Sequence, residues 1–245
     1  MKLGRVVILA VAALLAACSA VPANDAPAAG QLDQSVAFRG WVHMALPGKT
    51  ATRYQAVQVD GRDALEAQAQ SSASLVRQRL SLDPADLGSL RFSWRVPGLI
   101  DHADMGKRDT DDAVVRVALT FDGDRSRFSA RDGMLSELTL LLTGEPLPYA
   151  TLMYVWCNQR AVGSVINNPR TDRIRKLVVE SGQARLDKWL DYERDIRADY
   201  RAVFGEEPGR LIGVAIMTDT DNTASRAQAW YGPVEIRRTA LAAQP

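Results

Sequence analysis

The sequence predicts a mainly β domain, a two-sheet, jelly-roll-like β-sandwich with two accessory α-helices. From about residue 38 to residue 238, turn residues separate about ten short segments that are alternating or apolar in pattern. Two further segments carry apolar residues at helical spacing instead. A domain of about 200 residues can bury a sizeable core, and many short strands with few helices are typical of jelly rolls.

The strands are predicted from period-two alternation or from short apolar runs between turn residues. In Leu90–Val96, for example, leucine and aromatic side chains alternate with arginine and serine. Asp60-Gly61 predicts a tight hairpin, since both residues tolerate the positive φ of primed turns. Leu211–Met217 is apolar on both faces, which is typical of a central strand. The predicted strands are Trp41–Ala45, Tyr54–Val59, Asp63–Gln70, Ser74–Leu80, Leu90–Val96, Ala113–Phe121, Ala150–Cys157, Ile174–Glu180, Arg210–Thr218 and Ala227–Ile236.

Two apolar stripes at helical spacing predict the helices. The first consists of Met134, Leu135, Leu138, Leu141 and Leu142, and the second of Trp189, Tyr192, Ile196, Tyr200 and Val203. The second helix is expected to begin at about Asp191 and to end before Gly205, because Pro208 blocks its continuation. We expect each stripe to pack onto a sheet.

The start of the chain predicts a lipoprotein signal peptide. Lys2 and Arg5 precede the apolar run Val6–Ala17, which is too short to span a bilayer as a helix. Small residues lead directly into Cys18, as in a bacterial lipobox, so we expect Cys18 to be lipidated. Ordinary secretion with an unmodified Cys18 is the alternative. Lipidation would anchor the protein to a membrane in the periplasm, and Ser19 after Cys18 favours the outer membrane.

The predicted organisation is a signal peptide (1–17), the lipidated cysteine with a flexible tether (18–37), the sandwich domain (38–238) and a short tail (239–245). Without Lys2 and Arg5, 28 of the 30 basic residues remain against 29 acidic residues, a net charge of −1. This balance excludes the basic footprint of a nucleic-acid-binding protein. Cys157 is the only other cysteine, so no intrachain disulfide is expected once Cys18 is lipidated.

Several stretches, taken in order, resemble the family catalogued as domain of unknown function 3047. They are Asp111–Val117, Tyr154–Trp156, Asn168-Pro169, Asp199–Arg201, Phe204–Pro208, Met217–Thr223 and Ala229–Gly232. The chain departs from the family pattern at Asp195, Ala224 and Pro233, where Asn, Gly and Asp are expected. The resemblance implies a secreted bacterial envelope protein with a jelly-roll-like fold, and it implies no established activity.

The run Asp219–Thr223 follows an apolar strand and is predicted as the centre of a ligand site. Its short oxygen-bearing side chains could hydrogen-bond sugar hydroxyls, and two of them could hold calcium. The alternative is a turn in which the same side chains bond nearby backbone N–H groups. The residues concerned are Asp219, Asp221, Asn222 and Thr223, with Asp219 and Asp221 as the calcium candidates.

Three further residues complete the predicted ligand site. Asp112 and Arg116 share one face of a strand but lie about 13 Å apart, so each needs a partner on a neighbouring strand. That requirement predicts a polar sheet surface, with an ordinary solvated face or a structural salt bridge as the alternative. Tyr231 alternates with Trp230 in the last strand, and we predict Trp230 in the core and Tyr231 facing the ligand.

The sequence contains none of the common catalytic motifs, such as GxSxG, HExxH or a phosphate-binding loop. His43 and His102 are the only histidines, which disfavours a histidine-based metal site or triad. We therefore predict a lipid-anchored, non-catalytic domain that binds carbohydrate or another envelope component, without a cofactor unless calcium is bound. The alternatives are a polysaccharide-degrading hydrolase or lyase with paired carboxylates, and an assembly lipoprotein with a protein partner.

Overall fold

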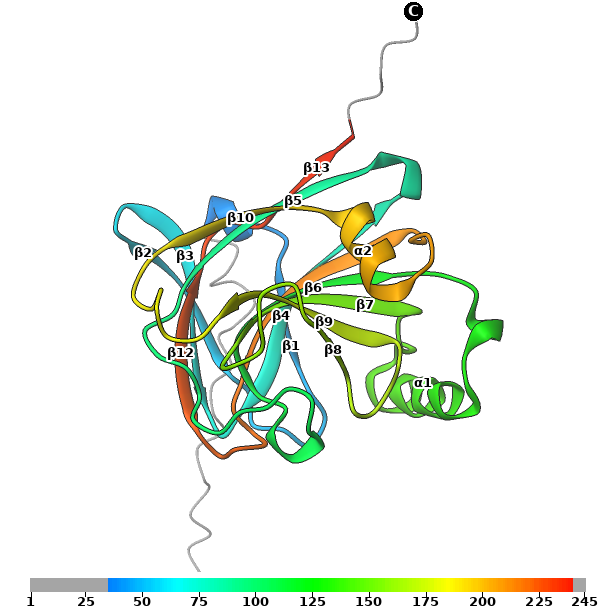
Figure 1. Ribbon diagram of the computed structural model, residues 1–245, viewed down its shortest axis with the longest axis horizontal. Helices are drawn as coiled ribbons and strands as arrows, with labels where there is room; N and C mark the ends of the chain where they lie inside the picture. Colours follow the sequence, from blue (N-terminus) through cyan, green and yellow to red (C-terminus); the bar gives the residue numbers. More distant parts are fainter. Residues whose placement is uncertain (1–34, 240–245) are drawn as a thin grey trace, which may run out of the picture.

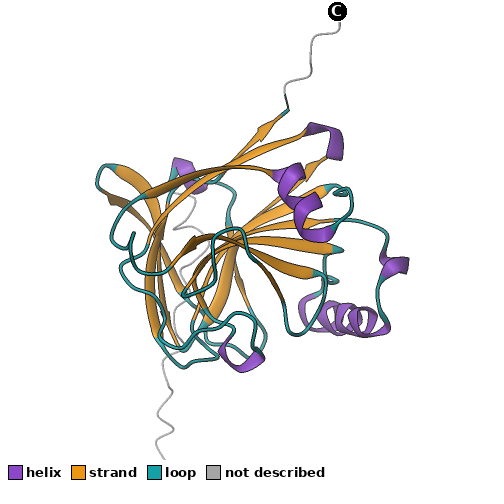
Figure 2. Cartoon of the chain, viewed as in Figure 1, coloured by secondary structure: helices purple, strands orange, loops and turns teal. Residues whose placement is uncertain are grey.

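The computed structural model describes residues 35–239 and forms a β-sandwich of jelly-roll type, with strands as its main elements and helices at its edges (Figures 1 and 2). The predicted fold class is confirmed. The predicted signal peptide, Cys18, most of the tether and residues 240–245 lie outside the described residues. Within residues 35–239, no helix combines the length and the apolar character needed to cross a membrane.

The sandwich consists of a seven-stranded and a six-stranded sheet. In spatial order, the larger sheet contains β1 (Val42–Ala45), β4 (Ala73–Leu82), β11 (Leu211–Asp219), β6 (Ala113–Phe121), β7 (Ala150–Cys157), β9 (Ile174–Ser181) and β8 (Val165–Asn167). The smaller sheet contains β10 (Leu190–Asp195), β5 (Leu87–Arg95), β12 (Arg226–Tyr231), β3 (Arg62–Gln70) and β2 (Arg53–Val59), with β13 (Glu235–Arg238) also paired to β5. β7 and β9 run parallel.

Alternation along the strands places the core between the two sheets. Trp94, Tyr54 and Tyr154 are among the largest side chains buried there. A second, smaller apolar cluster includes Val155 and Val178, which alternate along β7 and β9 with core residues and so lie on the outer face of the larger sheet. The larger sheet is therefore covered on both faces at this end.

The predicted strands are all present, with one division. The last one is split into β12 and β13 at Gly232-Pro233, because proline has no N–H to donate to the ladder. The hairpin at Asp60-Gly61 is confirmed, with φ values of 52° and 74°. The three-residue strand β8 has too short a pattern to be found from the sequence.

The second predicted helix is correct in its last part and wrong in its first. Helix α2 runs only from Ile196 to Phe204, and Leu190–Asp195 forms the edge strand β10, paired with β5. The sequence of this segment fits the helical period and also the strand period, since Leu190 and Tyr192 alternate with acidic residues. Pairing with β5 provides hydrogen-bond partners for its backbone groups, so the strand forms. Asp195 then accepts a hydrogen bond from the Ala198 N–H and begins the helix.

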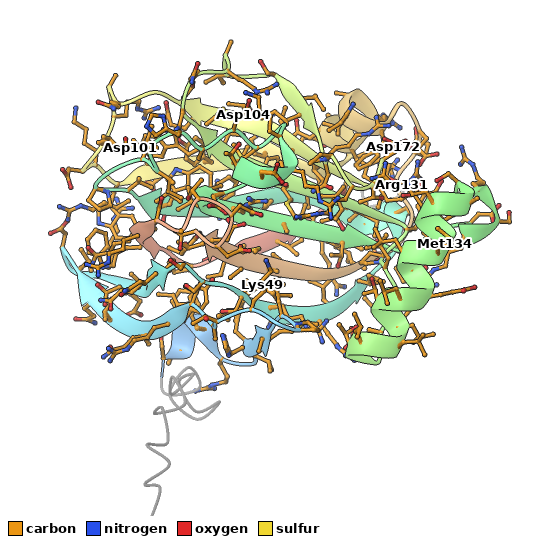
Figure 3. All side chains as sticks on the ribbon, turned by 90° about the horizontal axis from the view of Figure 1, so that it is seen from below. Lys49, Asp101, Asp104, Arg131, Met134 and Asp172 are labelled. Carbon is orange, nitrogen blue, oxygen red and sulfur yellow. The ribbon has the colours of Figure 1, made fainter. Side chains whose placement is uncertain are left out.

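The first helix, α1 (Ala130–Thr143), is present, but its apolar stripe does not pack onto a sheet as predicted. Met134 and Leu141 are 68% and 83% exposed, whereas Asp132 and Ser136 are buried. Figure 3 shows Met134 on α1 at one end of the molecule. The reason is polar anchoring: Asp132 accepts a hydrogen bond from Thr171, which turns the polar side of the helix inward.

Candidate functional site

The structure brings most of the predicted site residues together, in the interior. Asp112, Arg116 and Asp219 are 1%, 4% and 3% exposed, at the start of β6 and the end of β11. Two further charged residues, Asp111 and Lys176, are buried beside them. We refer to these five residues as the ionic cluster.

The two cations of the ionic cluster bind its carboxylates directly. Arg116 Nη2 lies 3.1 Å from Asp111 Oδ1 and 2.9 Å from Asp219 Oδ2. Lys176 Nζ, from β9, donates to Asp111 Oδ1 at 2.6 Å and to the Met105 carbonyl at 2.8 Å. Met105 and Asp111 belong to the segment between β5 and β6, so these bonds hold that segment over the outer face of the larger sheet.

Asp112 binds the loop between β11 and β12. Its Oδ1 accepts hydrogen bonds from the backbone and side-chain nitrogens of Asn222, at 3.2 and 3.0 Å. Its Oδ2 accepts from the Thr223 N–H at 2.7 Å and from the Thr223 hydroxyl at 2.6 Å. One buried carboxylate thus fixes the loop that the sequence singled out, and every contact shown for it lies within the chain.

Burial and neighbouring charges shift the pKa values of Asp219, Lys176 and Arg116. Removal from water raises the pKa of Asp219 to about 7 against the attraction of Arg116, and Asp112 adds to the rise. Burial and the neighbouring Arg116 lower the pKa of Lys176 to about 8. Burial alone would also lower the pKa of Arg116, but Asp219 and Asp111 outweigh it and raise that pKa.

Asp221 lies at the rim of the cluster, where it pairs with Lys49 of the loop between β1 and β2. Figure 3 shows Lys49. One carboxylate oxygen each of Asp112, Asp219 and Asp221 lie within 4.8 Å of one another. Such spacing suits a hard cation, but protein cations and N–H groups already contact all three carboxylates. The calcium role of Asp219 and Asp221 stays a prediction, as does the ligand role of the whole set.

The orientation predicted for the last strand is wrong by one residue. Tyr231 is fully buried, and its hydroxyl donates to the Met217 carbonyl at 2.7 Å. Trp230, predicted in the core, lies on the opposite face and is only partly buried. The register explains the reversal, because Tyr231 pairs with the core residue Trp94 of β5, and directly paired residues face the same side.

The outer face of the smaller sheet holds a groove of about 700 Å³ that the sequence analysis did not find. Its floor is formed by side chains from three adjacent strands, and the segments Ala51–Thr52 and Pro97–Leu99 also line it. The floor residues are Arg53 of β2, Gln68 and Gln70 of β3, and Arg226 and Gln228 of β12.

The strand register places these side chains in two rows. Arg53, Gln68 and Gln228 are paired directly across β2, β3 and β12, and Gln70 pairs with Arg226 in the next row. Paired residues project from the same face of a sheet. The alternation of side chains predicts each of these strands separately. Nothing in the sequence indicates that β3 and β12 are neighbours, so the floor of the groove could not be predicted from the sequence.

The polar groups of the groove have few partners. Gln228 donates to Glu66 at 2.6 Å and Arg53 contacts the Gln55 amide oxygen at 3.3 Å. No side-chain hydrogen bond or ion pair within residues 35–239 is shown for Gln68, Gln70 or Arg226. The groove therefore presents free amide and guanidinium groups to solvent, unlike the ionic cluster.

Comparison with known proteins confirms the resemblance found in the sequence. The model of a family described as "Protein of unknown function (DUF3047)" matches residues 39–235, most of the chain. A search of curated proteins found no match.

Several solved structures are similar in outline. A family 11 carbohydrate-binding module from a cellulase of Clostridium thermocellum has 7% identity and a TM-score of 0.41, covering 82% of this chain and 88% of the module. The family 11 xylanase from Neocallimastix patriciarum has 10% identity and a TM-score of 0.37, covering 82% and 92%. The module TmCBM61, solved with β-1,4-galactotriose, has 14% identity and a TM-score of 0.35, covering 86% and 96%. What this chain binds must therefore follow from its own side chains.

Proposed function

We propose that this chain, which belongs to the DUF3047 family, is a non-catalytic sandwich domain that binds carbohydrate in the groove of its smaller sheet. The observation that carries the proposal is a groove of about 700 Å³ whose floor consists of amide and guanidinium side chains. Ligand sites are typically concave and of this size, with a few polar groups that fix orientation.

The chemistry of the floor suits a ligand rich in hydroxyl groups. Each glutamine amide offers two donors and one carbonyl acceptor, so it can bond two neighbouring hydroxyls at once. Gln68 and Gln70 lie two residues apart on β3, about 7 Å along the strand. Strand neighbours are about 4.8 Å away on either side. The floor thus offers a small, regular array of donors and acceptors on a rigid sheet.

A half-buried aromatic ring continues this face. Trp230 follows Gln228 by two residues on β12, and it pairs with Glu66 of β3 and Arg95 of β5. The Arg95 guanidinium lies 5.4 Å from the centre of its ring. Trp230, and not the buried Tyr231, is the aromatic side chain that a bound chain extending from the groove would meet.

The groove does not favour hydrolysis. A glycosidase needs two carboxylates that flank the scissile bond, and no Asp or Glu lines this groove. No spacing in the sequence singles out such a pair. Of the aspartates in its polar runs, Asp112 and Asp219 are buried and bonded to protein groups, and Asp221 pairs with Lys49. The enzyme hypothesis stays an alternative that needs a turnover assay.

The proposal includes the cell envelope as the site of action. Lipidation at Cys18 would tether the domain to a membrane in the periplasm, with the outer membrane favoured by Ser19. The support for this part comes from the sequence of residues 1–19. A protein partner in envelope assembly is the remaining alternative, and it makes no use of the groove.

The test is a binding measurement with matched variants. Full-length protein purified in detergent is titrated calorimetrically with a panel of polysaccharides, using wild type, the double variant Gln68→Ala/Gln228→Ala, and Gln58→Ala as control. Gln58 is exposed on β2 of the same sheet but lies outside the groove. We expect the double variant to lose binding and the control to retain it. Equal binding by all three proteins would overturn the proposed site, and no binding by wild type would overturn the function.

A further inference from the structure

We propose that the carbohydrate bound in the groove is an anionic polysaccharide, whose repeating unit carries a carboxylate or a sulfate. The inference rests on the proposed function and deepens it. It depends on the two arginines of the floor, Arg53 and Arg226, and on the absence of acidic side chains from the lining of the groove.

The two arginines differ from others on the same face of the sheet. Arg91 is paired with Glu193 at 2.6 Å, and Arg95 with Asp60 at 3.0 Å. Arg53 and Arg226, in contrast, have no acidic partner within residues 35–239, and both are exposed. Arg91 and Arg95, which lie outside the groove, are thus neutralised by acidic partners, whereas the two arginines of the groove keep their charge unpaired.

The lining of the groove contains no acidic residue that would repel an anion. All the residues that line the groove are neutral except the two arginines, so the lining carries a formal charge of +2. In the next row, Glu66 accepts the hydrogen bond of Gln228, which occupies one of its oxygens. Because an arginine stays protonated at any physiological pH, this charge is permanent.

The guanidinium group also matches the shape of the expected ligand. Its planar fork donates two parallel hydrogen bonds to a carboxylate or a sulfate, and charge-assisted bonds of this kind are stronger than neutral ones. Gln68, Gln70 and Gln228 lie between or beside the arginines and would bond the uncharged hydroxyls of the same ligand.

The positions of the arginines suit a polymer. Arg53 lies on β2 and Arg226 on β12, so one strand, β3, separates them. Two strand spacings are about 10 Å, and the arginines are also offset by one row along the strands. The two cations would therefore contact charges on different sugar residues of one chain.

The experiment compares three ligands of similar length: a polyuronate, a sulfated polysaccharide and a neutral glucan. Full-length protein in detergent is titrated with each, as wild type, Arg53→Gln, Arg226→Gln and Arg238→Gln. Arg238 is the matched control, since it is exposed on β13 of the same sheet, has no acidic partner within residues 35–239 and lies outside the groove.

We expect at least one anionic ligand to bind about tenfold more tightly than the neutral glucan, a difference of about 1.4 kcal/mol. Each groove variant should reduce that affinity severalfold, added salt should weaken it, and Arg238→Gln should leave it unchanged. Preference for the polyuronate or for the sulfated chain identifies the anion. The inference would be overturned if the neutral glucan bound as tightly as the anionic ligands, or if both groove variants bound the anionic ligands as tightly as wild type does. Either result would still be consistent with carbohydrate binding in the groove. If the wild type bound none of the three ligands, both the inference and the proposed carbohydrate binding would be overturned.

Discussion

The ionic cluster and the groove both concentrate charged and amide side chains, and they use them in opposite ways. In the cluster, Arg116 and Lys176 are buried and bonded to carboxylates. In the groove, Arg53 and Arg226 are exposed and have no acidic partner within the described residues. The difference indicates that the cluster stabilises the fold, whereas the groove keeps its hydrogen-bonding capacity for a ligand.

The largest expected effect comes from removing a buried charge from the cluster. Asp112→Ala deletes the acceptor of four hydrogen bonds from Asn222 and Thr223. Leaving a buried donor without its acceptor typically costs about 1–3 kcal/mol, so we expect a loss of several kcal/mol in the free energy of unfolding. Urea denaturation followed by fluorescence measures it. Asp221→Ala, at the rim, is the comparison and should cost much less; equal losses would contradict the distinction.

The second prediction concerns pH. Because burial raises the pKa of Asp219 to about 7 in the folded state, above its ordinary value, the folded protein binds this proton more tightly than the unfolded chain. Its contribution to stability is therefore complete below about pH 4 and is lost as the pH rises through 7. Three pKa units correspond to about 4 kcal/mol, which is an upper limit here.

The measurement is the difference in unfolding free energy between wild type and Asp219→Asn, from pH 4 to pH 8. Asparagine keeps the shape but does not titrate, so the difference should change in favour of the variant as the pH rises. A difference that is constant over this range would show that Asp219 does not take up a proton there, and that Arg116 keeps it ionised.

Sequence patterns predicted most of the fold because strand alternation is a local property. Leu90, Phe92 and Trp94 face the core as their spacing indicated. Errors arose where two patterns fitted the same residues. Leu190–Asp195 suited both a helix and a strand, and only the neighbouring strand β5 decided between them.

The candidate site was less predictable than the fold, for a physical reason. Asp219–Thr223 is dense in polar groups, and that density serves internal bonds to Asp112. The groove is built from residues more than 150 positions apart, such as Gln68 and Gln228, which only the pairing of β3 with β12 brings together. The two sets of polar side chains differ in whether they are buried or exposed, and this difference cannot be read from a single sequence.

The third prediction separates binding from stability in the groove. Gln68→Ala/Gln228→Ala should change the unfolding free energy by less than about 1 kcal/mol, because Gln68 is exposed and Gln228 is only partly buried. The same variant should lower polysaccharide affinity at least tenfold. Thermal unfolding and calorimetry on one preparation test both parts. A clear loss of stability would place these glutamines with the cluster as structural residues.

The smallest expected effect is that of calcium on the ionic cluster. The oxygens of Asp112, Asp219 and Asp221 converge within 4.8 Å, but Arg116 bonds Asp219, Lys49 pairs with Asp221, and four donors contact Asp112. A divalent ion would have to displace these partners, so we expect the Tm to be the same in calcium and in EDTA. A ligand that binds only the folded state raises the Tm. A rise that depends on calcium and disappears in Asp221→Asn would therefore make the rim of the cluster a metal site, and the contrast with the groove would fail there.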